Sequence, residues 1–313
     1  MSRIASDKTA AVHCQEGETR RVPIALIGIG LMGTALTERL LAAGFALRGY
    51  DIAPERLRAF EAMGGTPAAS AADAARGAEV VITSLMTAAI VRQAVLGEQG
   101  AAEAMPPGSL LIDTTTCGPG ESIALANDLS PRGISLLDAT ISGSSASVRR
   151  GTAVVLAGGD PEAFERARPI FDAYARTALH VGPNGAGATA KLVVNLVVGL
   201  NRLALAEALT LGERAGIEPA RMLDVLREAA SYSRIMDGKG KLMVTGRFEP
   251  EARLSQHLKD VGLILDLGRE LSVPLPASAL HQQLLTAGVA RGWGDLDNAA
   301  IILVLRALAG GEA

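Results

Sequence analysis

The stretch ALIGIGLMGTAL, residues 25–36, places three glycines, Gly28, Gly30 and Gly33, between an apolar run and a helix-like segment. The apolar run is typical of a buried strand, and a helix is expected to begin around Met32. In this context the first glycine permits a tight turn, the second leaves room for a pyrophosphate, and the third allows close packing of helix and sheet. Free amides at a helix N-terminus favour a phosphate. The stretch therefore predicts a dinucleotide-binding turn.

An acidic residue, Asp51, closes the next predicted strand, about 20 residues beyond the loop, as dinucleotide-binding units require. A carboxylate there accepts hydrogen bonds from the ribose hydroxyls of adenosine and repels a 2′-phosphate. This favours NAD over NADP, although the nearby Arg48 and Arg56 leave NADP as an alternative. A glycine-rich turn followed by an N-cap aspartate before Pro54 would give the same letters without a ligand.

Short apolar runs alternate with helical segments up to about residue 183, which implies a doubly wound parallel sheet of the α/β Rossmann type. Beyond residue 186 nearly every segment has helical period, beginning with one helix of nearly 30 residues. We expect a flexible tail at 1–20, a dinucleotide-binding domain at 21–183, and an all-α substrate and oligomerisation domain at 184–313. The predicted strands are 24–28, 45–50, 80–85, 109–115, 135–140 and 153–158.

The composition argues against several classes of protein. Lys plus Arg total 30 against 33 Asp plus Glu, and 3% of residues are aromatic, so a nucleic-acid partner is not expected. Two cysteines are too few for a disulfide framework, and the four histidines lack metal-ligand spacing, so no metal is expected. The N-terminal segment has no signal-peptide core, and polar residues interrupt the longest apolar stretch, so no membrane partner is expected. We expect a cytoplasmic protein.

Two other segments carry polar groups suited to a small anionic substrate. Ser142, Gly143, Ser144 and Ser145 follow a predicted strand and could offer hydroxyls and backbone amides to a carboxylate, or form a plain flexible loop. Lys191 is the one full charge on the apolar start of the long helix. A buried lysine has a lowered pKa and suits proton transfer near neutral pH, whereas a lysine that extends to water would be structural.

Four segments in this order resemble the signatures of the β-hydroxyacid dehydrogenases, a family that includes 3-hydroxyisobutyrate dehydrogenase and tartronate semialdehyde reductase. They are IGIGLMG, DATISGSSASVRRGTA, GAGATAKLVVN and HLKDVGLIL. The resemblance covers the chain from about Val22 to near the C-terminus. It implies reversible hydride transfer between NAD, with NADP not excluded, and a small 3-hydroxy acid or its semialdehyde. It also implies a homodimer or higher homo-oligomer.

The resemblance also assigns roles to individual residues. Lys191 falls on the general acid/base, and Asn195 on the amide that binds the substrate hydroxyl beside it. The substrate carboxylate is assigned to Ser142, Gly143 and Ser144. The residues assigned to the cofactor are Gly28, Ile29, Gly30, Leu31, Met32, Gly33, Asp51, Leu85, Met86, Thr116 and Lys259.

The chain departs from the family pattern at the substrate loop. Ser144 and Ser147 stand where the family has glycines, and Thr140 replaces a proline. These changes add hydroxyls and bulk beside the carboxylate site, so the substrate stays open. An imine reductase shares the architecture but usually replaces the lysine, and a non-catalytic dinucleotide-binding module loses it. Lys191 therefore favours the dehydrogenase over both alternatives.

Overall fold

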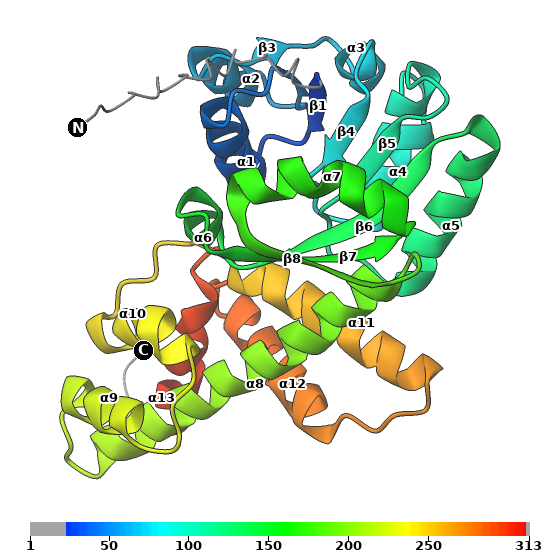
Figure 1. The fold of residues 1–313 in the computed structure, drawn as a ribbon. Helices are drawn as coiled ribbons and strands as arrows, with labels where there is room; N and C mark the ends of the chain where they lie inside the picture. The colour runs from blue at the N-terminus through cyan, green and yellow to red at the C-terminus, as the bar shows by residue number, and fades with distance from the viewer. Residues whose placement is uncertain (1–22, 311–313) are drawn as a thin grey trace, which may run out of the picture.

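The computed structural model describes residues 23–310, so the predicted tail at 1–20 lies outside the described part of the chain. Figure 1 shows a sheet flanked by helices, with a second group of helices beneath it. The eight strands of the described residues form one sheet in the order β3-β2-β1-β4-β5-β6-β7-β8. The predicted α/β class with a following helical part is confirmed. The predicted boundary at residue 183 falls between β8 and α8, and the division into domains stays a prediction.

The strands are short and mostly parallel. Their bounds are β1 Ile24–Ile27, β2 Leu47–Tyr50, β3 Thr66–Pro67, β4 Val80–Thr83, β5 Leu110–Asp113, β6 Ser135–Ser142, β7 Ala153–Gly159 and β8 Ala175–Gly182. The helices that accompany them are α1 Leu31–Ala42, α2 Pro54–Ala62, α3 Ala71–Ala75, α4 Ala88–Leu96, α5 Pro119–Leu129, α6 Ser145–Arg149 and α7 Pro161–Tyr174. Short 3₁₀ turns lie at η1 Ala101–Glu103 and η2 Ser130–Arg132.

One pairing differs from the wholly parallel sheet that the sequence predicts. Strand β7 runs antiparallel to β6, while the other named pairs are parallel. The connection between β6 and β7, residues 143–152, contains only the short helix α6. A parallel partner needs a longer crossover, so the chain turns back on itself here. The Ser-Gly-Ser segment therefore lies in a tight reversal at the carboxyl end of β6.

Alternate residues of the central strands enter two different cores, because helices cover both faces of the sheet. In β1, Ile24 and Leu26 join the cluster around Phe60, whereas Ala25 and Ile27 join the cluster around Val81. This explains why the central strands are apolar throughout and lack alternation. A third core lies among the helices that follow the sheet.

The helical part is built on α8, Ala186–Arg214, which runs diagonally below the sheet in Figure 1. The elements packed around it are α9 Pro219–Glu228, a π-helical turn η3 Met236–Gly240, α10 Lys241–Thr245, α11 Leu254–Glu270, α12 Pro276–Ala290, η4 Asn298–Ala300 and α13 Ile301–Leu308. Within the described residues, α8 is the one helix long and apolar enough to cross a membrane. A core helix of a soluble protein meets the same criteria.

The start of α8 is fixed against β6 by Asp138. This buried carboxylate accepts hydrogen bonds from the backbone N–H groups of Gly185 at 3.0 Å and Ala188 at 2.8 Å. Burial raises the pKa of Asp138, although these amide bonds oppose the rise. A Cβ on Gly187 would lie 2.1 Å from the Asp138 carbonyl oxygen, so only glycine fits there. The first turn of the long helix is therefore held tightly beside the sheet.

Candidate functional site

The glycine loop has the geometry of a phosphate-binding turn. Gly28 has a φ of +93°, and a Cβ there would lie 2.4 Å from the carbonyl oxygen of Ser84. A Cβ on Gly33 would lie 2.0 Å from the Gly28 oxygen, so helix α1 approaches the end of β1 at its third residue. Gly30, in contrast, faces open space. With α1 beginning at Leu31, these residues fit the pyrophosphate of a dinucleotide.

Asp51 is tied to this loop. It is buried, its Oδ2 accepts a hydrogen bond from the Ile29 N–H at 2.7 Å, and its Oδ1 accepts one from the Ala53 N–H at 2.9 Å. The Arg56 guanidinium pairs with the same carboxylate at 3.3 Å. Arg48 pairs instead with Asp73 at 3.0 Å. Asp51 thus holds the cofactor loop in place. Arg48, one of its two neighbouring arginines, forms its ion pair with a different carboxylate.

The ends of β4 and β5 meet the helical part through Lys259. Its ammonium group donates hydrogen bonds to the carbonyl oxygens of Thr116 at 2.9 Å and Met86 at 3.3 Å. The neighbouring Leu85 N–H donates to the Thr115 hydroxyl at 3.2 Å. The structure therefore brings the predicted cofactor residues Leu85, Met86 and Thr116 together with Lys259 at one edge of the sheet.

A buried acid, Asp113, ends strand β5. The Asp113 carboxylate accepts hydrogen bonds from the Thr83 hydroxyl at 2.8 Å and the Thr115 N–H at 3.0 Å. Burial raises the pKa of Asp113 to about 6, with Asp138 acting in the same direction. These bonds fix the turn from which Thr116 follows.

Lys191 and Asn195 lie one turn apart on α8. The Asn195 amide donates a hydrogen bond to Asp260 Oδ2 at 3.0 Å, and Lys259 pairs with Asp260 Oδ1 at 3.1 Å. Burial lowers the pKa of Lys191; the charge of Asp260 opposes this shift and that of Lys259 adds to it. A lysine that extended freely into water would not be desolvated in this way. The structure thus places a lysine of lowered pKa one helical turn from an amide that Asp260 orients.

Sequence reasoning assigned Lys259 but missed its neighbour Asp260. Asp260 is buried, so its pairing with Lys259 differs from an exposed ion pair on a helix surface. A signal for this lies in the sequence, because His257, Val261 and Ile264 share the apolar spacing of the buried face of α11. Asp260 falls on that same face, where a carboxylate needs a partner.

The Ser-Gly-Ser segment lies at the carboxyl end of β6. Gly143 has a φ of +139°, and Ser144 caps helix α6 by accepting a hydrogen bond from the Ser147 N–H at 3.4 Å. Strand β6 runs beside α8, as the 3.2 Å bond from the Thr140 hydroxyl to the Gly187 carbonyl shows. Ser142, two residues beyond Thr140, lies on the same face of β6 as Thr140, whose hydroxyl contacts α8. Open sheets bind ligands at this edge.

Arg149, which follows this loop, has a structural role on the cofactor side. Arg149 forms a bidentate ion pair with Glu38 of α1, with nitrogen–oxygen distances of 2.8 and 3.2 Å. The loop is thus tied to the helix that follows the glycine turn. This ion pair argues against the alternative of a plain flexible loop.

Comparison with known proteins gives the same assignment along nearly the whole chain. Residues 23–182 match the model of the NAD binding domain of 6-phosphogluconate dehydrogenase. Residues 185–305 match the NAD-binding domain of NADP-dependent 3-hydroxyisobutyrate dehydrogenase. L-threonate dehydrogenase from Cupriavidus necator is 34% identical, covering 90% of this chain and 95% of its own length. The crystal structure of 3-hydroxyisobutyrate dehydrogenase from Salmonella typhimurium has a TM-score of 0.83 at 30% identity, covering 90% and 99%.

The chain therefore belongs to the β-hydroxyacid dehydrogenase family and is an NAD(P)-dependent oxidoreductase. The imine reductase from Pseudomonas sp. has a TM-score of 0.62 at 17% identity, which is a likeness of fold alone. The imine reductase alternative is thus the more distant one. The residues assigned to the site stay predictions, which the contacts above support.

Proposed function

We propose that this protein oxidises a small 3-hydroxy acid reversibly, with Lys191 as the proton-transfer group, at the edge of the sheet where α8 and α11 meet β4, β5 and β6. The observation that carries the proposal is the desolvated Lys191 beside the Asn195–Asp260 hydrogen bond. When bound, the nicotinamide cofactor accepts or supplies the hydride. The residues of the chain provide binding, orientation and proton transfer.

The substrate carboxylate is held by the Ser142 hydroxyl and the backbone amides of Gly143 and Ser144, because successive amides in a tight reversal form an anion-binding concavity. Asn195, oriented by Asp260, donates a hydrogen bond to the substrate hydroxyl oxygen. During oxidation the neutral Lys191 amine takes the hydroxyl proton. During reduction the Lys191 ammonium gives a proton to the developing alkoxide. A lowered lysine pKa makes the neutral form available near neutral pH.

The cofactor loop, with Asp51 beside it, favours NAD over NADP. Arg48 is paired with Asp73, and Arg56 is paired with Asp51. A 2′-phosphate would therefore have to compete with the Asp51 carboxylate for the Arg56 guanidinium. We expect a higher kcat/KM with NAD than with NADP. A higher kcat/KM with NADP would contradict this preference and leave the reaction itself in place.

Replacement of Lys191 tests the proposal. Lys191→Ala is expected to retain cofactor affinity and to lose on the order of 100- to 10,000-fold in kcat, the usual cost of removing a general acid/base. Lys241→Ala is the control, because Lys241 is exposed on α10. The measurement is NADH formation with a panel of hydroxy acids, alongside cofactor titration by fluorescence. Wild-type kcat in Lys191→Ala would refute the role of Lys191.

A cytoplasmic location and a homo-oligomeric state belong to the same proposal. Support for the oligomer comes from α8, whose outward face exposes Val193, Val197 and Leu211 by half or more. An apolar stripe along a helix of this length is more typical of a contact surface than of a free one.

A further inference from the structure

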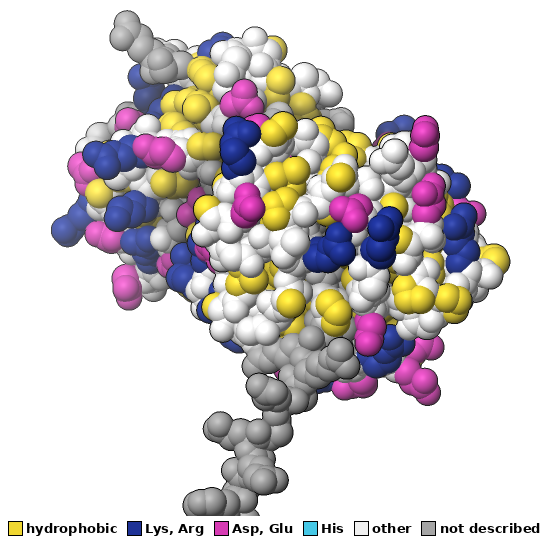
Figure 2. All heavy atoms as spheres, turned by 90° about the horizontal axis from the view of Figure 1, so that it is seen from above, with side chains coloured by type: hydrophobic (Ala, Val, Ile, Leu, Met, Phe, Trp, Pro, Cys, Tyr) yellow, Lys and Arg dark blue, Asp and Glu magenta, His cyan; other side chains and the backbone are white. Residues whose placement is uncertain are grey.

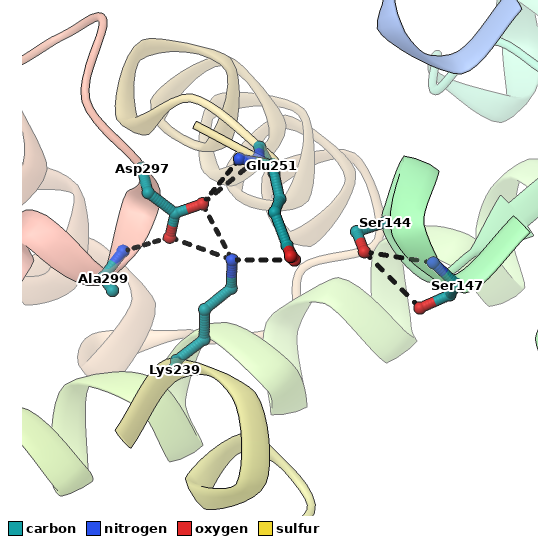
Figure 3. A network of polar contacts seen from close by, with 7 residues as sticks. Ser144, Ser147, Lys239, Glu251, Asp297 and Ala299 are labelled. Atoms are coloured by element: carbon teal, nitrogen blue, oxygen red, sulfur yellow. Dashed lines mark hydrogen bonds and ion pairs between the residues drawn. The ribbon is translucent and has the colours of Figure 1, made fainter. Parts of the chain in front are cut away.

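The hydroxyls of Ser144 and Ser147 lie at the end of the Ser-Gly-Ser loop, and the Glu251 carboxylate lies across from them (Figure 3). The proposed reaction uses none of these three side-chain groups. We propose that Ser144, Ser147 and Glu251 form a subsite for an additional hydroxyl group of the substrate. The substrate is then a hydroxy acid with a hydroxylated, uncharged tail rather than one with an apolar tail or a second anionic group. This inference rests on the proposed function and specifies its substrate class.

The base of the subsite is Asp297, which is fully buried. Its carboxylate binds the Lys239 ammonium at 2.8 and 2.9 Å and accepts hydrogen bonds from the backbone N–H groups of Glu251 at 3.0 Å and Ala299 at 3.0 Å. A weaker bond of 3.3 Å comes from the Ala252 N–H. The segment that carries Glu251 is therefore fixed to the segment around Asp297. The Glu251 side chain therefore projects from a fixed backbone.

Glu251 itself is directed out of this support. Its carboxylate lies 3.8 Å from the Lys239 ammonium and is half exposed, whereas the Lys239 side chain is largely buried. Figure 3 shows the Glu251 carboxylate between the Lys239 ammonium and the Ser144 hydroxyl, with α6 on the far side. In Figure 1 the loop that follows α10 likewise passes next to α6. The carboxylate thus faces the substrate loop and has acceptor capacity to spare.

The two serines supply the opposite wall. Their hydroxyl oxygens are 3.5 Å apart, and the Ser147 Oγ is 3.4 Å from the position that a Cβ would take on Gly143. The hydroxyl of Ser147 thus lies directly against the loop assigned to the substrate carboxylate. Each serine hydroxyl can both donate and accept, and the bonds between them are long. Both groups therefore have hydrogen-bonding capacity left for a ligand.

These groups select one kind of substrate tail by their chemistry. An ionised carboxylate only accepts hydrogen bonds, so Glu251 requires a donor such as a hydroxyl and repels a second carboxylate or a sulfonate. The serines can then donate to the oxygen of that same hydroxyl. A methyl group in this position would leave the spare hydrogen-bonding capacity of the three groups unused and shielded from water, which is costly in a site closed by a bound substrate.

Substrate panels with single variants test the subsite. The quantity compared is the ratio of kcat/KM for the sugar acids threonate and erythronate to kcat/KM for 3-hydroxyisobutyrate. We expect this ratio to exceed one in the wild type. It should fall about 3- to 10-fold in Glu251→Gln, because the amide oxygen still accepts a hydrogen bond but lacks the charge, and about 3- to 10-fold in Ser147→Ala. Oxidation of the dicarboxylate malate should improve in Glu251→Gln relative to threonate, because a like charge is removed.

Glu249→Gln is the matched control, since Glu249 is exposed on the same segment two residues earlier. It should leave the ratio unchanged, and melting temperatures should show that all variants fold. An unchanged ratio in both Glu251→Gln and Ser147→Ala, or a wild-type preference for 3-hydroxyisobutyrate, would overturn the subsite while the proposed reaction stands. If the wild type binds cofactor and oxidises none of these acids, the proposed function fails and the subsite fails with it.

Discussion

Asp260 illustrates how one side chain sets the properties of two others. It orients the Asn195 amide through a 3.0 Å hydrogen bond, and its charge raises the pKa of Lys191 against the effect of burial. Lys259 has the opposite effect on Lys191 and occupies the second oxygen of Asp260. The basicity of Lys191 is thus a balance between a desolvated position and two neighbouring charges of opposite sign.

We therefore expect Asp260→Asn to shift the pH profile of the reaction. Loss of the negative charge lowers the pKa of Lys191 further, so the neutral amine forms at lower pH and the rising limb of kcat for oxidation moves to lower pH. Asparagine can still accept the hydrogen bond from Asn195. The measurement is kcat against pH, with the exposed Asp266→Asn on the same helix as control. An unmoved profile would show that Asp260 does not act on Lys191.

The free energy of unfolding is also expected to depend on pH, because two histidines are buried between helices. In the core of α8, α11 and α12, Arg202 donates a hydrogen bond to His257 Nε2 at 3.1 Å, and the His257 and His281 rings lie 5.2 Å apart. Burial, reinforced by Arg202, lowers the pKa of His281 to about 4 and that of His257 well below its usual range. Gly199 leaves the space for these rings, since a Cβ there would lie 2.7 Å from His257.

A folded-state pKa below the unfolded value means that the unfolded chain binds the proton first. Above pH 6.5 these histidines therefore do not reduce the free energy of unfolding. As the pH falls from 6.5 toward 4, they reduce it, by up to about 3 kcal/mol from His281 alone. Urea unfolding at pH 7 and pH 4.5 measures this loss. In His281→Gln the loss between the two pH values should be smaller, and an equal loss would assign it to other groups.

The junction of α8 with the sheet predicts a steric effect. Gly187→Ala would place a methyl group 2.1 Å from the Asp138 carbonyl oxygen and should cost about 1–3 kcal/mol of unfolding free energy. Gly262→Ala on α11 is the control, because its Cβ meets nothing closer than 3.8 Å and alanine favours a helix. A denaturation midpoint for Gly187→Ala equal to that of the wild type would contradict the close packing of α8 on β6.

Some of these elements follow from local sequence and others do not. The glycine turn, the apolar central strands and the 29-residue helix α8 each have strong local patterns, and the structure contains all of them. Strand β8 is exposed along most of its length and β3 has two residues, so neither has the apolar run that predicts a strand. The antiparallel course of β7 depends on the shortness of the preceding connection, which apolar patterns do not report.

The site shows the same division. The glycine loop, Lys191 and Asn195 lie in local motifs and could be found from sequence. The contact of Lys259 with Thr116 joins residues far apart in the chain, and so does the support of Glu251 by Asp297. Such contacts depend on how the helices dock against the sheet. Sequence spacing within one segment cannot reveal them.

Taken as one molecule, the chain presents two very different surfaces. On the face shown in Figure 2, acidic and basic side chains are interspersed with hydrophobic ones, and neither sign forms a continuous patch. Along α8, by contrast, Val193, Val197, Ala204 and Leu211 form an exposed stripe at helical spacing. The proposed oligomer would cover this stripe.

Val197→Lys should therefore weaken self-association, because a charge in the middle of an apolar contact is costly to bury. Sedimentation velocity at micromolar concentration should show a smaller species than the wild type. Thr245→Lys, on the exposed end of α10, is the control. A wild-type protein that sediments as a monomer under the same conditions would count against the predicted oligomer.

The anchoring of residues 251–252 on Asp297 separates substrate choice from chemistry. This support uses main-chain amides and Lys239, and it includes neither the proton-transfer lysine nor the cofactor loop. The tip of the segment can thus change its side chain without disturbing the reaction centre. Natural drift or deliberate redesign could retarget the enzyme to new metabolites by altering a single exposed position, Glu251, on an otherwise constant frame.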